Sequence, residues 1–182
     1  MHTQTFTDNP VRIVIADDHE ILIDGFCFAI RKCKDLHIVG KALDGEMVLQ
    51  VMEAERPHIV FIDIQMLKKN GIEATKEIKK RFPDVKVIAF TGFADDCYIT
   101  DMMIEAGASG YLLKEDSKKI LEAIKAVMNN DVYCSEEVSK KLVRLLQETQ
   151  TNPLKPFNKP VFTDIELLVK KLQWAERKAN CT

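Results

Sequence analysis

Short apolar runs alternate with segments of helical periodicity along the first two-thirds of this chain, and this alternation constrains the fold most strongly. Four runs rich in Val, Ile, Leu and Phe occupy residues 11–16, 58–62, 85–90 and 109–113. Such runs are typical of parallel strands buried on both faces. Segments with helical spacing cover residues 23–33, 45–55, 71–82, 95–107 and 117–128. This series predicts an α/β fold, a doubly wound parallel sheet with helices on both faces.

Polar residues follow the ends of these apolar runs. Asp17 and Asp18 come after the first run, Asp63 after the second, Thr91 after the third and Lys114 after the fourth. In open parallel sheets, ligands bind beyond the carboxyl ends of the strands. We therefore expect these five side chains to lie close together, although they are distant in sequence.

The three carboxylates of this group predict a metal site. Carboxylates gathered at one edge repel one another unless a proton or a cation lies between them. Oxygen ligands suit Mg²⁺, which binds through one or two carboxylates together with waters and phosphate oxygens. The Cys and His residues have no spacing that resembles a zinc site. Asp17, Asp18 and Asp63 therefore indicate magnesium, whereas His19 is interpreted as a partly exposed helix residue without a catalytic role.

Asp63 is the candidate nucleophile, because a carboxylate can form an acyl phosphate and so divide phosphoryl transfer into two steps. Lys114 and Thr91 would contact the phosphoryl oxygens, the first with a fixed charge and the second with a hydrogen bond. Taken singly, each residue also fits an ordinary role, such as a helix cap or a surface lysine. Together they predict a magnesium-dependent phosphoryl-accepting site.

At these residues the chain resembles the receiver domain of two-component response regulators. The matching stretches are VRIVIADDHEI, PHIVFIDIQMLKKNGIEATKEIK, VIAFTGF and AGASGYLLKE. The Asp-Asp-His trio and the GYLLK segment are most similar to the NarL/LuxR (FixJ) branch. The resemblance implies a flavodoxin-like (βα)₅ domain that acts in transcription regulation. It would be a signalling switch with self-catalysed phosphoryl transfer and autodephosphorylation, not a conventional metabolic enzyme.

The resemblance also implies a partner and a set of metal ligands. Asp63 would accept the phosphoryl group from a sensor histidine kinase. The metal ligands would be Asp17, Asp18, Asp63 and the backbone carbonyl of Gln65. Leu67 stands where the family usually has proline, a departure that predicts a looser loop after Asp63 and removes no catalytic group.

A switch from Thr91 and Tyr111 is implied as well, because Tyr111 matches the aromatic switch position of receivers. Simple packing at the last strand is an equally good interpretation of Tyr111, since buried tyrosines often only seek a hydroxyl partner. Phosphorylation would shift the surface around the fourth helix, fifth strand and fifth helix. Receiver surfaces of this kind would also support homodimers or heterodimers.

Composition adds the compartment. The five cysteines are scattered without framework spacing, and an odd number in a βα chain indicates reduced thiols in a cytoplasm. The sequence contains no apolar run long enough for a bilayer, so no membrane partner is expected. The N-terminus lacks the hydrophobic segment of a signal peptide. The formal net charge of −2 gives no overall electrostatic attraction for nucleic acid.

The organisation changes after the receiver-like part, and three domains are predicted. Residues 1–130 would form the receiver, and residues 131–160 a linker helix followed by a polar, proline-containing linker. The helical stretch 136–148 is interpreted either as the connecting helix of NarL/LuxR regulators or as a terminal helix packed on the receiver. Residues 161–182 resemble only the first helix of a LuxR-type helix-turn-helix. Because no recognition helix follows, direct sequence-specific DNA binding by this chain is not expected.

Two other classes of function remain as alternatives. The first is a phosphorylation-independent docking or dimerisation module, although a scaffold has no chemical need for both Asp63 and Lys114. The second is an aspartyl-nucleophile phosphatase, which normally needs a second Asp two residues after the nucleophile. That position is Gln65 here. Turnover of a simple phosphate ester would favour the phosphatase.

Overall fold

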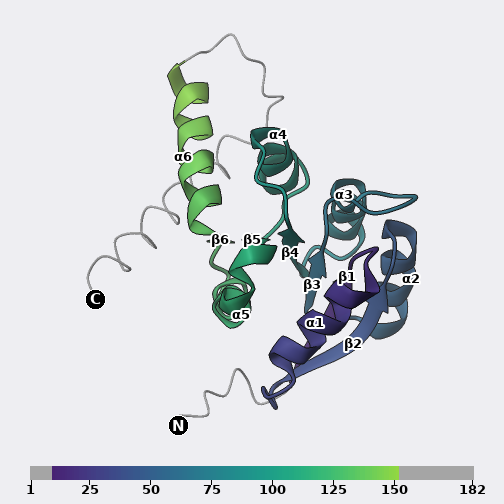
Figure 1. Ribbon diagram of the computed structural model, residues 1–182. Coiled ribbons are helices and arrows are strands. Elements are labelled where there is room, and N and C mark those ends of the chain that lie inside the picture. The colour runs from purple at the N-terminus through teal and green to yellow at the C-terminus, as the bar shows by residue number, and fades with distance from the viewer. Residues whose placement is uncertain (1–9, 152–182) are drawn as a thin grey trace.

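The computed structural model describes residues 10–151, and in them six parallel strands form one sheet flanked by helices (Figure 1). The strands are β1 Val11–Ala16, β2 Leu36–Ala42, β3 Ile59–Ile62, β4 Lys86–Thr91, β5 Gly110–Leu113 and β6 Tyr133–Cys134. Their spatial order is β2-β1-β3-β4-β5-β6. The first five follow the flavodoxin-like order, so the fold expected from the sequence is confirmed.

Helices follow these strands, one after each of them. They are α1 Glu20–Ile30, α2 Gly45–Glu55, α3 Gly71–Arg81, α4 Asp96–Thr100, α5 Ile120–Met128 and α6 Glu136–Thr151. The helical segment expected over residues 95–107 is divided, because α4 continues as a π-helical turn, η1 Asp101–Glu105. A 3-10 helix, η2 Lys114–Lys119, comes before α5.

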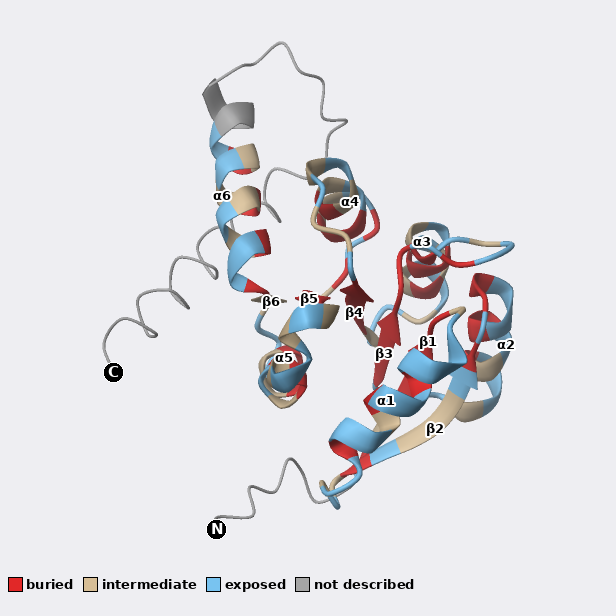
Figure 2. Cartoon of the chain, viewed as in Figure 1, coloured by how far each residue is buried: buried red, intermediate tan, exposed pale blue. Residues whose placement is uncertain are grey.

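Alternate residues of the central strands pack into two hydrophobic clusters, one on each face of the sheet. On β1, Ile13 and Ile15 join the cluster beneath α1 and α5. Val14 and Ala16 point the other way, into the cluster with α2, α3 and α4. Figure 2 shows these central strands buried. Burial on both faces explains why these strands are apolar along most of their length.

The segment after α5 adds to the same sheet and the same core. The short strand β6 pairs in parallel with Gly110 and Tyr111 of β5. The amphipathic helix α6 then buries Val138, Leu142 and Leu146 in the cluster that contains α4. The predicted helix over residues 136–148 is therefore present, and its apolar face packs on the receiver.

Two polar contacts hold α6 to the loop after β4 and to the first residue of α4. Lys141 Nζ donates to the carbonyl of Ala94 at 2.8 Å. Arg144 pairs with Asp96, at 2.5 Å between nitrogen and oxygen. The helix predicted over residues 161–182, with its helix-turn-helix resemblance, lies outside the described residues.

Two expectations from composition can be compared with residues 10–151. None of the helices in this part of the chain is long and apolar enough to cross a bilayer. Its cysteines, Cys27, Cys33, Cys97 and Cys134, are all free thiols. The thiols agree with the expected absence of a disulfide framework in this part of the chain.

Candidate functional site

The side chains expected at the carboxyl ends of the strands lie at one edge of the sheet. Asp17 and Asp63 directly follow β1 and β3, Thr91 ends β4, and Lys114 directly follows β5. Lys114 Nζ lies 2.7 Å from Asp17 Oδ2 and 2.6 Å from Asp63 Oδ2. One ammonium group therefore bridges two carboxylates from two different strands.

Both bridged carboxylates are almost completely buried and are oriented by the backbone. Asp17 is 1% exposed and Asp63 is 4% exposed. Oδ1 of Asp63 accepts a hydrogen bond from the amide of Ile64 at 2.7 Å. Oδ1 of Asp17 accepts one from the amide of His19 at 3.0 Å. In each carboxylate one oxygen is held by the chain and the other faces Lys114.

The charge state of Lys114 follows from this arrangement. Burial works to lower the pKa of Lys114, because it disfavours the charged ammonium. Hydrogen bonds to Asp17 and Asp63 outweigh burial, so the pKa of Lys114 is raised above its usual value. Lys114 therefore stays protonated at neutral pH. The stability that this raised pKa contributes is present below the ordinary lysine pKa and is lost as pH rises through the raised value.

Asp18 adds a third carboxylate with an unpaired oxygen. Its Oδ1 is buried and has no hydrogen-bond donor in good geometry, although His19 Nδ1 lies 2.8 Å away. Ligand atoms of Asp17, Asp18 and His19 all lie within 4.8 Å of one another. Lys114 contacts two of the three carboxylates, so its single ammonium leaves uncompensated negative charge, and carboxylate oxygens are the ligands that a hard cation prefers. The residues present therefore fit Mg²⁺.

Gln65 lies two residues after Asp63, on the loop between β3 and α3. Its side-chain amide donates to the hydroxyl of Tyr98 on α4 at 2.8 Å. The ring of Tyr98 also packs on that of Phe93, with centroids 5.4 Å apart. Tyr98 was not among the residues predicted from the sequence, because helical periodicity does not tell which loop a helix faces. The expected role of the Gln65 backbone carbonyl as a metal ligand stays a prediction.

The two expected switch residues converge on the backbone of Phe93. Thr91 is completely buried, and its Oγ1 accepts a long hydrogen bond of 3.4 Å from the Phe93 amide. Tyr111 is also completely buried, and its hydroxyl donates to the Phe93 carbonyl at 2.7 Å. Burial, together with the charges of Asp95 and Asp63, raises the pKa of Tyr111. Tyr111 therefore has the hydroxyl partner that the packing interpretation expected, and its switching role stays a prediction.

Comparison with known proteins adds independent information. Residues 13–153 match the family model of the response regulator receiver domain. The transcriptional regulatory protein DegU of Brevibacillus brevis is 36% identical over 138 residues, which cover 75% of this chain and 58% of DegU. The transcriptional regulatory protein LiaR of Bacillus subtilis is 31% identical over 159 residues, which cover 87% of this chain and 74% of LiaR.

Solved structures give the same result at the level of the fold. A LuxR-family two-component response regulator from Aurantimonas sp. SI85-9A1 superimposes with a TM-score of 0.71 at 26% identity, covering 75% of this chain and 98% of that one. The isolated receiver domain of RcsB from Salmonella enterica, in the presence of the phosphomimetic BeF₃⁻, gives a TM-score of 0.67 at 23% identity. It covers 73% of this chain and 99% of the RcsB domain.

Proposed function

Because the chain belongs to the response regulator receiver domain family, with NarL/LuxR-type transcriptional regulators among its relatives, we propose that Asp63 is its phosphoryl acceptor. The donor is the phosphohistidine of a sensor histidine kinase, and the reaction depends on Mg²⁺. The observation that carries this proposal is the Lys114 ammonium, 2.7 Å from Asp17 and 2.6 Å from Asp63. It places a fixed positive charge beside the nucleophile.

The residues divide the reaction between them. An Asp63 carboxylate oxygen forms the bond to phosphorus while the phosphorus–nitrogen bond of the donor breaks and the imidazole nitrogen keeps the electron pair. The Ile64 amide holds Oδ1 of Asp63, which limits rotation of the carboxylate. Lys114 then donates to the phosphoryl oxygens. Asp17, Asp18, Asp63 and the Gln65 carbonyl hold Mg²⁺, which neutralises charge on those oxygens when it is bound.

Transmission of the signal begins at Thr91. Its hydroxyl turns toward the phosphoryl oxygens, so the Phe93 amide loses the weak acceptor it now has. The loop after β4 therefore shifts, and Tyr111 follows through its bond to the Phe93 carbonyl. The contact between Lys141 and Ala94 passes this shift to α6. The change at the surface of α4 and β5 is thus passed to the output partly through α6.

The kinase reaches Asp63 past an apolar surface on α1. Ile21 is 80% exposed, and Phe28, two turns further along the same face of α1, is 62% exposed. A pocket of about 230 Å³ separates α1 from η2, with Leu22 and Lys114 in its lining. Exposed apolar side chains of this size indicate a protein contact.

Control of transcription is proposed for the regulator as a whole, since the chain spans 58% of DegU and 74% of LiaR.

The direct test is the intact mass of the protein after incubation with acetyl phosphate, with and without Mg²⁺. A small donor avoids the need to know the kinase. We expect a gain of one phosphoryl group that requires Mg²⁺. A folded protein that gains no mass under either condition would instead support the docking module, and steady release of inorganic phosphate from generic esters would support the phosphatase.

Replacing the bridging ammonium should separate metal binding from phosphoryl transfer. In Lys114→Met, Mg²⁺ should bind about tenfold more tightly, because the positive charge that now lies between the carboxylates is removed. Phosphoryl uptake from acetyl phosphate should slow by about 100-fold, because the transferring group loses a charged donor. Titration calorimetry measures the first effect and intact mass over time measures the second.

Lys118→Met is the matched control, because it removes an exposed lysine from the same 3-10 helix. Both its metal affinity and its phosphorylation rate should match the wild type. Weaker Mg²⁺ binding by Lys114→Met would show that Lys114 does not compete for the carboxylates and would count against the proposed arrangement.

A further inference from the structure

The loop between β3 and α3 carries Gln65, but the residues of the loop do little to restrict its conformation. Leu67 stands where proline is usual in the family, and it is 70% exposed. Lys68 adopts a left-handed backbone with φ of 61°, which costs energy for a residue that has a Cβ. A loop of this kind keeps one conformation only if groups outside it hold it in place.

The N-terminus of α2 holds the loop in place. Asp44 and Leu67 form an isolated parallel β-bridge, and the Gly45 amide donates to the Lys69 carbonyl at 3.1 Å. The approach is so close that a Cβ on Gly45 would lie 2.3 Å from that carbonyl oxygen. Lys68 Nζ completes the attachment with an ion pair to Asp44 Oδ2 at 2.6 Å. The loop is therefore docked on α2 through both backbone and side chain.

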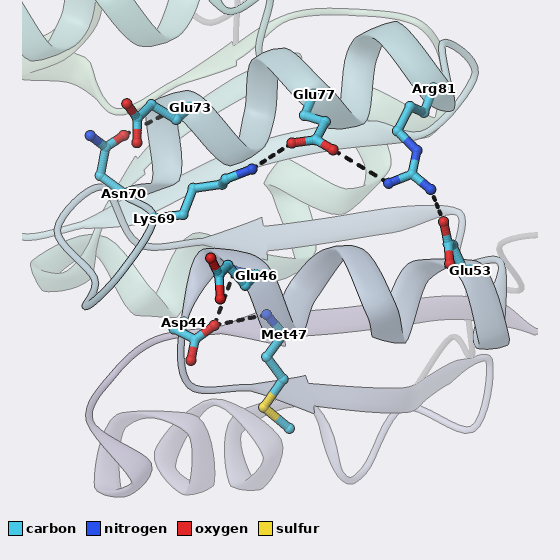
Figure 3. A network of polar contacts seen from close by, with 9 residues as sticks. All are labelled: Asp44, Glu46, Met47, Glu53, Lys69, Asn70, Glu73, Glu77 and Arg81. Atoms are coloured by element: carbon cyan, nitrogen blue, oxygen red, sulfur yellow. Dashed lines mark hydrogen bonds and ion pairs between the residues drawn. The ribbon is translucent and has the colours of Figure 1, made fainter.

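Asp44 is oriented by the first turn of α2, as Figure 3 shows. Its Oδ1 accepts hydrogen bonds from the amides of Glu46 and Met47, at 3.0 and 2.8 Å, and so caps α2. Its Oδ2 is left for Lys68. The hydrogen bond from Lys68, followed by the one from Met47, lowers the pKa of Asp44. An ionised and buried carboxylate thus provides a fixed partner for an exposed lysine side chain.

We propose that Asp44 and Lys68 are positioning residues for the metal site, because they hold the loop in the conformation that presents the Gln65 carbonyl to Mg²⁺. The ion pair between Asp44 and Lys68 restricts the loop through a contact, whereas the usual proline would restrict the backbone through its ring. This inference rests on the proposed function, since it assigns the loop to the same magnesium ion. Neither residue touches the ion or the phosphoryl group.

The direction of the change in Mg²⁺ affinity distinguishes a positioning role of Lys68 from a purely electrostatic one. Lys68→Met removes a positive charge near an acidic site, which by electrostatics alone strengthens cation binding. If the loop position matters, affinity falls instead, by about tenfold, the lower end of the range for partners that orient metal ligands. Mg²⁺ affinity of the full chain is measured by titration calorimetry. The Mg²⁺ concentration that half-saturates phosphorylation should rise by the same factor, while the rate at saturating Mg²⁺ stays near the wild-type value.

Lys69→Met is the matched control. It removes the same charge one residue along the loop and breaks an ion pair to Glu77 of α3 at 2.5 Å, drawn in Figure 3, but leaves the contact with Asp44 intact. It should bind Mg²⁺ at least as tightly as the wild type. Lys68→Arg, which can still reach Asp44, should restore most of the affinity lost in Lys68→Met.

Each outcome has a distinct meaning. Wild-type or tighter Mg²⁺ binding by Lys68→Met overturns the positioning role, as does an equal loss in Lys69→Met. Failure of the wild type to bind Mg²⁺ or to take up a phosphoryl group rejects the proposed function instead. Because Lys68 is 62% exposed, the variant should fold normally, and its thermal unfolding curve checks this.

Discussion

Asp63→Asn is expected to gain no phosphoryl mass from acetyl phosphate at any Mg²⁺ concentration. The amide keeps the shape of the carboxylate and can still accept from the Ile64 amide through its oxygen. It is not a nucleophile, so no acyl phosphate can form. Lys114 retains Asp17 as a partner at 2.7 Å, so the fold should persist. The expected result is complete loss of labelling with a circular dichroism spectrum like that of the wild type.

The control for this experiment is another carboxylate that acetyl phosphate can reach. Asp24 is exposed, pairs with Lys41 at 2.8 Å and is not among the proposed metal ligands. Asp24→Asn should be labelled to the same extent as the wild type. Labelling of Asp63→Asn at the wild-type level would place the acceptor elsewhere and reject the assignment.

Leu142→Ala should lower the free energy of unfolding by about 3 kcal/mol, within the range of 2 to 5 for a leucine removed from a packed core. Leu142 is completely buried, although it lies on α6, beyond the last helix of the expected five-fold repeat. Its side chain fills the cluster beside α4, and the truncated residue would leave a cavity there. Urea unfolding followed by circular dichroism measures the change.

Lys140→Ala on the same helix is the reference. The Lys140 side chain is 71% exposed, and its pairing with Glu136 is a surface contact between residues i and i+4. Such contacts contribute little, so the change should stay within about 0.5 kcal/mol. Equal stability of Leu142→Ala and the wild type would mean that α6 is a separate linker helix rather than part of the receiver core.

The central strands could be predicted from sequence because burial on both faces makes them nearly continuous apolar runs. Strand β2 was not among the four runs, and the structure explains why. It is an edge strand of the sheet, and only Leu36 and Ala42 at its ends are buried, while His37 and Lys41 are exposed. A half-exposed edge strand gives a weaker pattern than a buried one. The division of the fourth helix into α4 and η1 left no recognisable signal either.

The location of the site residues could be predicted from the sequence, but the contacts between them could not. The rule for carboxyl ends of parallel strands brought Asp17, Asp63 and Lys114 together, and the structure confirms that they meet. Nothing in the sequence indicated that Lys114 would bridge both carboxylates or that Tyr98 would hold Gln65. Such contacts depend on side-chain conformations and on how far each loop extends. Similarly, helical periodicity predicted α6 but could not identify the surface it covers.

The contact between α6 and the loop after β4 couples the helix to the phosphoryl site. Lys141 holds the carbonyl of Ala94, three residues after Thr91, so the helix and the phosphoryl site act on one loop. Coupling between two sites through a shared element is reciprocal, and each changes the binding equilibrium at the other by the same factor. If phosphorylation loosens α6, then any partner that draws α6 away must favour phosphorylation of Asp63. The helix would then be an input to the receiver as well as its output.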